Sequence, residues 1–208
     1  MKFILGTKQN MTQVFDEKGQ VFAGTILRVE PMKVSQIKTS EKDGYVAAQL
    51  VSGAQKEQRL SKAVVGQRKG AFKYAREFRP NLVKNETIEG LEIGSVIDLS
   101  LFAPGDIVMV SALSKGKGFQ GVVKRHGFHG GAGSHGQKHS LREPGSIGGG
   151  GRAGGRVAKG TRMAGRMGYD RVTVKNLRVL QVNVAENVLV LSGAVPGRRG
   201  TLVEVRGV

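Results

Sequence analysis

The sequence predicts a mainly β protein: a small closed β-barrel, one short helical segment, and a long irregular loop rich in Gly, Lys and Arg inserted between strands. Two observations predict this fold. Many short strand-like runs are separated by turn signals at regular spacing, and long helical periods are absent. In residues 114–168, by contrast, neither period 2 nor period 3.6 persists for more than a few residues. We therefore expect residues 1–113 and 169–208 to form the barrel body and residues 114–168 to form the loop.

The strand-like runs are rich in β-branched and apolar residues and are bounded by Gly, Pro, Asp or Asn. They are residues 2–5, 12–15, 21–29, 33–39, 45–50, 96–102, 107–113, 171–184, 188–191 and 202–205. Turn chemistry is clearest around Gly19, Gly44 and Pro104-Gly105, so the first two turns predict hairpins in a meander.

Two segments between these runs differ from the rest. Residues 60–70 (LSKAVVGQRKG) are predicted to form one or two helical turns, with Ser61 as N-cap and Gly66 or Gly70 as the stop. Residues 73–79 carry five charges and precede Pro80, which favours an exposed or edge strand, or a second RNA-facing segment.

The composition restricts the class of protein. The chain has 208 residues, a formal net charge of +17 and no cysteine. Such a charge indicates a nucleic-acid or anionic-membrane partner. The absence of cysteine excludes disulfides and thiolate catalysis. No apolar run reaches about 18 residues and the N-terminus turns polar after three apolar residues, so we expect a cytoplasmic protein with one core.

The loop is the most unusual stretch. Its 55 residues hold 18 of the 32 glycines, all four histidines, 11 Lys or Arg residues and a single acid, Glu143. Ordering such a chain costs roughly 1 to 2 kcal/mol per residue, and its few apolar residues cannot offset that cost. A dense polyanion outside the chain is therefore expected to order it.

Basic residues spread among glycines are typical of a chain threaded through folded RNA, where each side chain meets a different phosphate. The predicted RNA-binding side chains are Lys115, Lys117, Lys124, Arg125, His126, His129, His135, Lys138, His139, Arg142, Arg152, Arg156, Lys159, Arg162 and Arg166. Histidine would donate to phosphate or 2′-hydroxyl groups, or stack on bases. The glycines predicted to let the backbone approach RNA are Gly116, Gly118, Gly121, Gly145 and Gly148.

The sequence disfavours nucleotide binding, metal binding and Ser-His-acid catalysis. Gly116, Gly118 and Gly121 match G-x-G-x-x-G, but a nucleotide site needs a helix directly afterwards, and residues 122–131 make a poor one. The four histidines lie beside basic residues, which disfavours a metal site. A Ser-His-acid triad lacks a rigid frame and a buried acid. We predict no catalytic residue, no cofactor and no metal.

The motifs resemble those of the bacterial large-subunit ribosomal protein L three family. The strongest match is SKGKGFQG at Ser114–Gly121, which continues to Lys124-Arg125-His126. Further blocks similar to the family are residues 5–8, 11–16, 142–148, 157–168, 171–174 and 193–197. The chain departs from the family pattern at Asn10, at Met109 and at Gly149–Gly151, where it has no glutamine that could be methylated.

The resemblance implies a translation-protein-like barrel on the subunit surface and a loop that penetrates 23S rRNA towards the peptidyl-transferase centre. The loop tip would be residues 145–155, with residues 115–125 and 156–166 as stems. The resemblance also implies a non-enzymatic, structural role, early binding in assembly, and contacts with ribosomal proteins L fourteen and L nineteen.

Two functions from other classes remain open at this point. One is a free RNA-binding or RNA-chaperone protein, which would not fractionate stoichiometrically with large subunits. The other is an ATP-dependent enzyme that binds ATP at Gly116–Gly121. ATP would raise the stability of such a protein.

Overall fold

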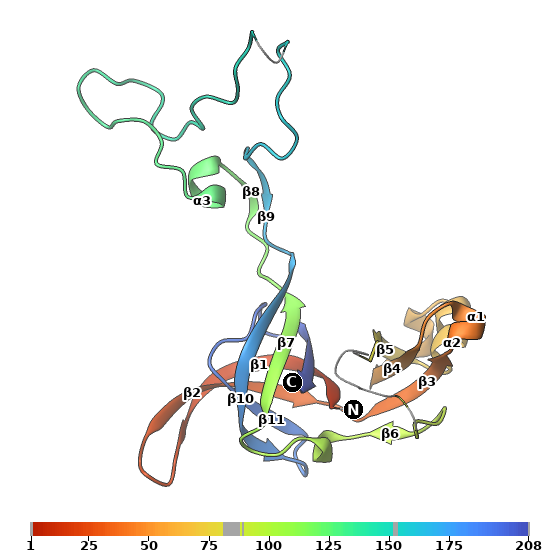
Figure 1. Ribbon diagram of the computed structural model, residues 1–208. Coiled ribbons are helices and arrows are strands. Elements are labelled where there is room, and N and C mark those ends of the chain that lie inside the picture. The colour runs from red at the N-terminus through yellow and green to blue at the C-terminus, as the bar shows by residue number, and fades with distance from the viewer. Residues whose placement is uncertain (1, 81–87, 89, 152–153, 208) are drawn as a thin grey trace. The chain divides into compact units, whose positions relative to one another are not determined.

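The computed structural model describes residues 2–80, 88, 90–151 and 154–207. Tertiary contacts divide the chain into two compact units: the body, Met1–Leu113 with Arg171–Val208, and the insertion, Ser114–Asp170. The mainly β prediction is confirmed, since strands are the dominant elements (Figure 1). No helix in the described part of the chain is long and apolar enough to cross a membrane.

Six strands of the body pair in a ring. They are β1 (Phe3–Phe15), β2 (Val21–Val29), β7 (Ile107–Leu113), β10 (Arg171–Asn183), β11 (Val188–Ser192) and β12 (Leu202–Gly207). Their order is β1-β12-β7-β10-β11-β2, every pair is antiparallel, and β2 pairs again with β1. The ring therefore leaves no strand edge unpaired along its order, which removes a route to edge-to-edge association.

The second sheet of the body has the order β5-β4-β3-β6. Its strands are β3 (Met32–Lys38), β4 (Ala47–Ala54), β5 (Phe72–Phe78) and β6 (Val96–Ile97). β3, β4 and β5 are consecutive antiparallel neighbours. The hairpins predicted around Gly19 and Gly44 form, as β1 with β2 and β3 with β4, but the predicted meander does not, because β2 and β3 lie in different sheets. β5 lies at the edge of the sheet, so the prediction of an edge strand for residues 73–79 is confirmed.

The prediction of one short helical segment is wrong. The described residues form three short helices, α1 (Ser40–Asp43), α2 (Lys62–Arg68) and α3 (Val122–His126), and 3-10 turns at Glu57–Arg59 and Leu99–Leu101. For α2 the predicted cap is correct, because the Ser61 hydroxyl accepts a hydrogen bond from the Val64 amide. Of the two predicted stops, Gly66 is wrong because it lies within α2; the helix ends at Lys69, in the left-handed conformation at φ 52°, one residue before Gly70.

The predicted strand over residues 96–102 is also too long. Only Val96 and Ile97 pair with β3, and Asp98 then caps the 3-10 turn by accepting from the Ser100 amide. Conversely, the two separate runs 2–5 and 12–15 belong to one continuous strand, β1, with a register shift between Lys8 and Met11. A local irregularity lets the strand bend without ending.

Alternating side chains build the core of the body. On β7, Val108, Val110 and Ala112 are buried while their neighbours are not, and on β12 the same holds for Val203 and Val205. These residues meet in register, with Val203 opposite Ala112 and Val205 opposite Val110. Together with buried residues of β1, β2, β11 and the second sheet they form one apolar cluster, as period-2 patterning with one buried face predicts.

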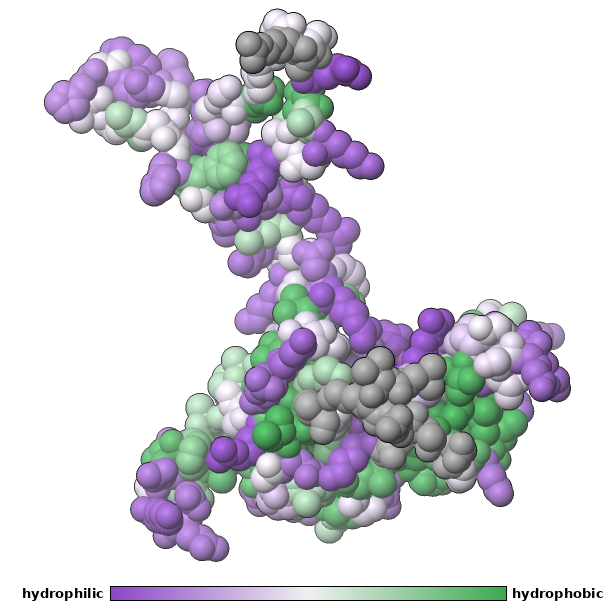
Figure 2. Space-filling model, in the orientation of Figure 1, coloured by the Kyte–Doolittle hydropathy of each residue, from purple (hydrophilic) through white to green (hydrophobic). Residues whose placement is uncertain are grey.

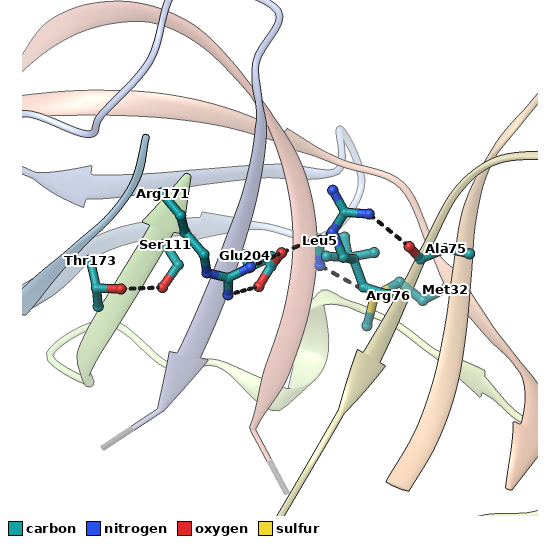
Figure 3. A network of polar contacts seen from close by, with 8 residues as sticks. All are labelled: Leu5, Met32, Ala75, Arg76, Ser111, Arg171, Thr173 and Glu204. Atoms are coloured by element: carbon teal, nitrogen blue, oxygen red, sulfur yellow. Dashed lines mark hydrogen bonds and ion pairs between the residues drawn. The ribbon is translucent and has the colours of Figure 1, made fainter. Parts of the chain in front are cut away.

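A polar network joins the two sheets of the body. The largely buried Glu204 carboxylate of β12 accepts from Arg76 Nε of β5 at 3.0 Å and from Arg171 Nη1 of β10 at 3.0 Å (Figure 3). Beside it, the Ser111 and Thr173 hydroxyls are 2.7 Å apart across β7 and β10 (Figure 3). Two guanidinium groups on one carboxylate fix β5 against the ring with charge-assisted hydrogen bonds.

A second polar cluster lies between β3, β4 and β5. The Lys38 ammonium is 2.8 Å from the Glu77 carboxylate, and the Tyr45 hydroxyl donates to Glu77 at 2.9 Å. The hydrogen bond from Lys38, followed by that from Tyr45, holds the pKa of Glu77 below its ordinary value, and the hydrogen bonds of Lys38 to Glu77 and Tyr45 raise the pKa of Lys38. Because ionised Glu77 is favoured in the folded state, its contribution to stability is present above its unfolded pKa and is lost as the pH falls through the lower folded pKa.

We expect Glu77→Gln to weaken the pH dependence of stability below about pH 4, the range in which glutamate protonates. The variant should be less stable than the parent at pH 7, and the difference should shrink as the pH falls. Urea unfolding between pH 3 and pH 7, about the range of carboxyl titration, measures this. Glu41→Gln, an equal charge change at an exposed residue, is the control. A difference between parent and Glu77→Gln that is constant with pH would contradict the prediction.

Candidate nucleic-acid interface

The base of the insertion is a short, closely fitted ladder. β8 (Gly118–Gln120) pairs antiparallel with β9 (Gly165–Met167), with Phe119 opposite Arg166. Next to the ladder, the Lys117 amide donates to the Met167 carbonyl at 2.9 Å and the Ser114 amide to the Asp170 carbonyl at 2.8 Å. The two chains of the insertion are thus held together by backbone hydrogen bonds where they begin and end.

Gly168 is required at this base. Its φ is +77°, and a Cβ placed there would lie 2.2 Å from the Lys115 carbonyl oxygen. Any side chain therefore meets both backbone strain and a backbone clash that no rotamer can relieve.

We expect Gly168→Ala to open the ladder. Amide hydrogen exchange at Ser114 and Lys117 should become faster, because their acceptors Asp170 and Met167 flank the displaced residue. Gly160→Ala is the matched control, since Gly160 has a similar φ of +86° but no atom within 4 Å of the added Cβ. Equal exchange in the two variants would mean that the close fit at Gly168 is unimportant.

A short helix follows the ladder. α3 begins after Gly121 and ends at Gly127, which has φ 73°. Sequence reasoning wrongly expected no helix directly after the glycines. Val122 of this helix is buried, and two side chains of its last turn reach a distant carbonyl. Arg125 Nη1 lies 2.6 Å and His126 Nε2 lies 3.0 Å from the Met163 carbonyl oxygen, so α3 is tied to the returning chain.

Beyond α3, the chain folds back on itself. The Gly131 amide donates to the Ser140 carbonyl at 3.0 Å, and the Glu143 amide donates to the same oxygen at 3.3 Å. A Cβ on Gly130 would lie 1.9 Å from the Leu141 carbonyl oxygen, so the two segments touch through their backbones. An open pocket of about 560 Å³ lies beside them, lined among others by His126, His129 and Arg162.

The predicted basic residues are presented to solvent. Nine of them are exposed and Arg125 is partly buried; the nine are Lys115, Lys117, Lys124, Lys138, Arg142, Arg156, Lys159, Arg162 and Arg166. Arg152 lies outside the described residues. No ion pair forms among the described residues of the insertion, whose only acids are Glu143 and Asp170. The surface of the insertion is mainly hydrophilic or intermediate in hydropathy (Figure 2).

The predicted glycines differ in one respect from Gly168 and Gly130. A Cβ at Gly118, Gly121, Gly145 or Gly148 would meet no atom within 4 Å, and at Gly116 the nearest is Tyr169 Cβ at 3.8 Å. Steric contact within the insertion therefore does not require glycine there, although Gly118 (φ 68°), Gly145 (φ 77°) and Gly148 (φ 148°) adopt conformations that favour it. Their backbones are open to a ligand.

The four histidine side chains of the insertion do not form a cluster. His126 is partly buried and shares the Met163 carbonyl with Arg125, whereas His129, His135 and His139 are exposed. Within the described ranges, no three His, Asp or Glu side chains are arranged to hold a metal ion.

Two aromatic residues of the insertion were not among the predicted site residues. The Phe119 side chain is 76% exposed and the Tyr169 side chain 59% exposed. Arg166 lies opposite Phe119 in the ladder, and its guanidinium carbon is 5.3 Å from the Tyr169 ring centre. The available signal was their position at either end of a basic, glycine-rich stretch, where aromatic rings are a feature of single-strand RNA binding.

The fold and the site define a basic, mainly β protein with an exposed, cation-rich insertion. Residues 81–189 match the family described as Ribosomal protein L3. A "Large ribosomal subunit protein uL3" of Herpetosiphon aurantiacus is 45% identical over 202 residues, covering 97% of this chain and 94% of that one. The proteins of that description from Acidothermus cellulolyticus (46% over 206 residues; 99% and 92%) and Chloroherpeton thalassium (44% over 210 residues; 99% and 98%) are similar.

Identity of this extent over nearly the whole chain shows the family. The chain belongs to the ribosomal protein L3 family, and the resemblance found in its motifs is confirmed. The family and these relatives are ribosomal proteins, and no enzyme family is indicated.

Proposed function

We propose that the protein is a structural component of the large ribosomal subunit in the bacterial cytoplasm, where it binds 23S rRNA. Family membership supports the ribosomal role. The observation that carries the RNA-binding role is the insertion, whose described Lys and Arg side chains are nearly all exposed and form no ion pairs within it. Unpaired cations on a glycine-rich chain favour many separate phosphate contacts.

In this proposal, the body is the translation-protein-like barrel that docks on the rRNA surface, and residues 114–168 are the loop that penetrates it. The pairing order of the six-stranded ring supports the barrel assignment. The loop extends towards the peptidyl-transferase centre and braces the surrounding RNA by neutralising phosphates where strands converge. Peptidyl transfer itself belongs to the RNA, and the protein carries no catalytic residue.

The residues proposed to contact rRNA are those predicted from the sequence. Among them, Arg125 and His126 have a second role, because both already bind the Met163 carbonyl. They would therefore shape the loop as well as meet RNA. Gly116, Gly118, Gly121, Gly145 and Gly148 would let the backbone approach the RNA, which their open surroundings support.

Early binding in assembly, and contacts with ribosomal proteins L fourteen and L nineteen, complete the proposal. They rest on family membership. A protein that folds its own body and carries a chain requiring RNA for order suits early binding, because its site is still accessible before other proteins cover it.

Binding of the purified protein to a 3′-half fragment of 23S rRNA, compared with an unrelated RNA of equal length across a salt series, tests this function. The paired variant lacks residues 127–155. If the body selects the site and the loop adds charge contacts, the variant keeps the preference with a shallower salt slope, by roughly 0.7 to 0.9 for each lost contact. No preference for 23S rRNA by either protein would overturn the proposal and favour a free RNA-binding protein.

A further inference from the structure

Phe119 occupies a position that the fold of the insertion does not explain. Its ring is 76% exposed, on a three-residue strand, and is the most exposed of the large apolar side chains described. Burying a phenylalanine side chain is worth about 1.5 to 3 kcal/mol, so leaving one in water gives up a large stabilisation. A ligand that covers the ring would recover it.

The ladder pairs Phe119 with Arg166, and a cation-π contact joins Arg166 to a second aromatic ring. Directly opposed residues of an antiparallel pair project from the same face, so Phe119 and Arg166 share one face of β8 and β9. Arg166 in turn packs on the Tyr169 ring at 5.3 Å. The three form an aromatic, cationic, aromatic row, which we call the stacking row.

The backbone under the stacking row is held in place. Tyr169 has φ 60°, a left-handed conformation that is uncommon for a residue with a side chain. The preceding Gly168 lies against Lys115, and the following Asp170 exchanges two hydrogen bonds with Ser114. Neighbouring structure thus fixes the backbone that carries the Tyr169 ring, which lowers the conformational entropy that binding has to remove.

We propose that Phe119, Arg166 and Tyr169 form a platform on which unpaired RNA bases stack. The inference rests on the proposed function and specifies its chemistry at this place: the cations contact phosphates, and the stacking row contacts bases. Aromatic rings and guanidinium planes are the groups on which splayed RNA bases stack. The arginine between the rings adds an attraction to base faces.

The surroundings of the stacking row favour RNA over a protein partner. Lys115, Lys117 and Lys124 are exposed nearby in the sequence, against the single acid Asp170. The backbones at Gly118 and Gly121 are open, which gives room for a strand beside the Phe119 ring. Protein-binding surfaces, by comparison, have an apolar centre from which charged groups are depleted.

Binding to two RNAs separates the contribution of base stacking to affinity from the contribution of charge. One is a single strand of about 12 nucleotides, the size of an ordinary single-strand site, and the other is its abasic counterpart with the same phosphates. The full-length protein, Phe119→Leu and Phe119→Tyr are compared by fluorescence anisotropy. Val157→Ala, at another exposed apolar residue of the insertion, is the matched control.

We expect Phe119→Leu to bind the base-containing RNA roughly fivefold or more weakly, because base stacking on an aromatic ring is lost. Phe119→Tyr and Val157→Ala should bind it as the parent does. On the abasic RNA all four proteins should have equal affinity. The salt slope of Phe119→Leu should equal that of the parent, because no phosphate contact changes. A 2-aminopurine in the RNA should be quenched less by Phe119→Leu.

Three outcomes would overturn the platform. Equal binding of Phe119→Leu and the parent to the base-containing RNA would mean that Phe119 stacks on nothing. An equal loss on abasic RNA would assign the effect to charge or folding. Normal RNA binding with loss of a ribosomal protein from subunits reconstituted with the variant would make the row a protein contact. In each case a parental preference for 23S rRNA leaves the proposed function standing, whereas loss of that preference in the parent itself overturns the function.

Discussion

Neutralising five exposed cations of the insertion is expected to weaken binding to 23S rRNA on the order of 10³-fold at 0.1 M salt. The five are Lys138, Arg142, Arg156, Lys159 and Arg162, each changed to Gln. None of them forms an ion pair in the described structure, so their removal leaves no carboxylate unpaired. The salt slope should fall by roughly 3.5 to 4.5, and filter binding across a salt series measures both quantities.

The control for this prediction removes the same charge from the body. The control replaces five exposed cations of the body by Gln together, so that it has the same net charge as the insertion variant. The five are Lys18, Lys42, Lys56, Arg59 and Lys62. We expect this variant to lose much less affinity, because a contact requires position as well as charge. Equal losses in the two variants would show that the protein attracts RNA only through its total charge.

The largest effect on stability is expected in the ring of the body. Leu27 of β2 and Leu189 of β11 lie opposite one another and are fully buried. Leu27→Ala or Leu189→Ala removes a side chain from a packed interior and leaves a cavity, so each should lower the free energy of unfolding by about 2 to 5 kcal/mol. Since small domains are stable by about 5 to 15 kcal/mol, either variant approaches the limit of folding.

Urea unfolding of the free protein measures this effect. Leu141→Ala, which removes the same atoms from a side chain that is 52% exposed, should change the unfolding free energy by less than about 0.5 kcal/mol. A change below about 1 kcal/mol in Leu27→Ala would imply that the site collapses around the cavity. The RNA affinity of any variant that remains folded should be unchanged, because neither leucine reaches the surface.

Local chemistry explains which elements could be predicted from the sequence. The turn at Gly19, with φ 76°, and the N-cap at Ser61 depend on residues within a few positions of one another. The ring order and the network around Glu204 depend on pairs far apart in the chain, such as Arg76 with Glu204. Period-2 patterning identifies strands and their buried faces, but not their neighbours.

The same distinction applies to the candidate site. Exposure of the loop cations follows from a stretch that has almost no acids and few apolar residues, and it was predicted. The contacts of Arg125 and His126 with the Met163 carbonyl join residues nearly 40 positions apart, so local sequence could not predict that α3 is tied to the returning chain. Predicting the stacking row likewise requires the register between two distant segments, because this register places Phe119 opposite Arg166.

The ends of the insertion are also the ends of two paired strands. Leu113 of β7 lies opposite Arg171 of β10, so the chain leaves and re-enters the body at neighbouring positions, about 5 Å apart in such pairs. The ring therefore closes the loop whatever its length, and doubling the length adds only about 0.6 kcal/mol of closure entropy. Segments of different length can therefore be inserted between Leu113 and Arg171 while the same body continues to fold around its own core.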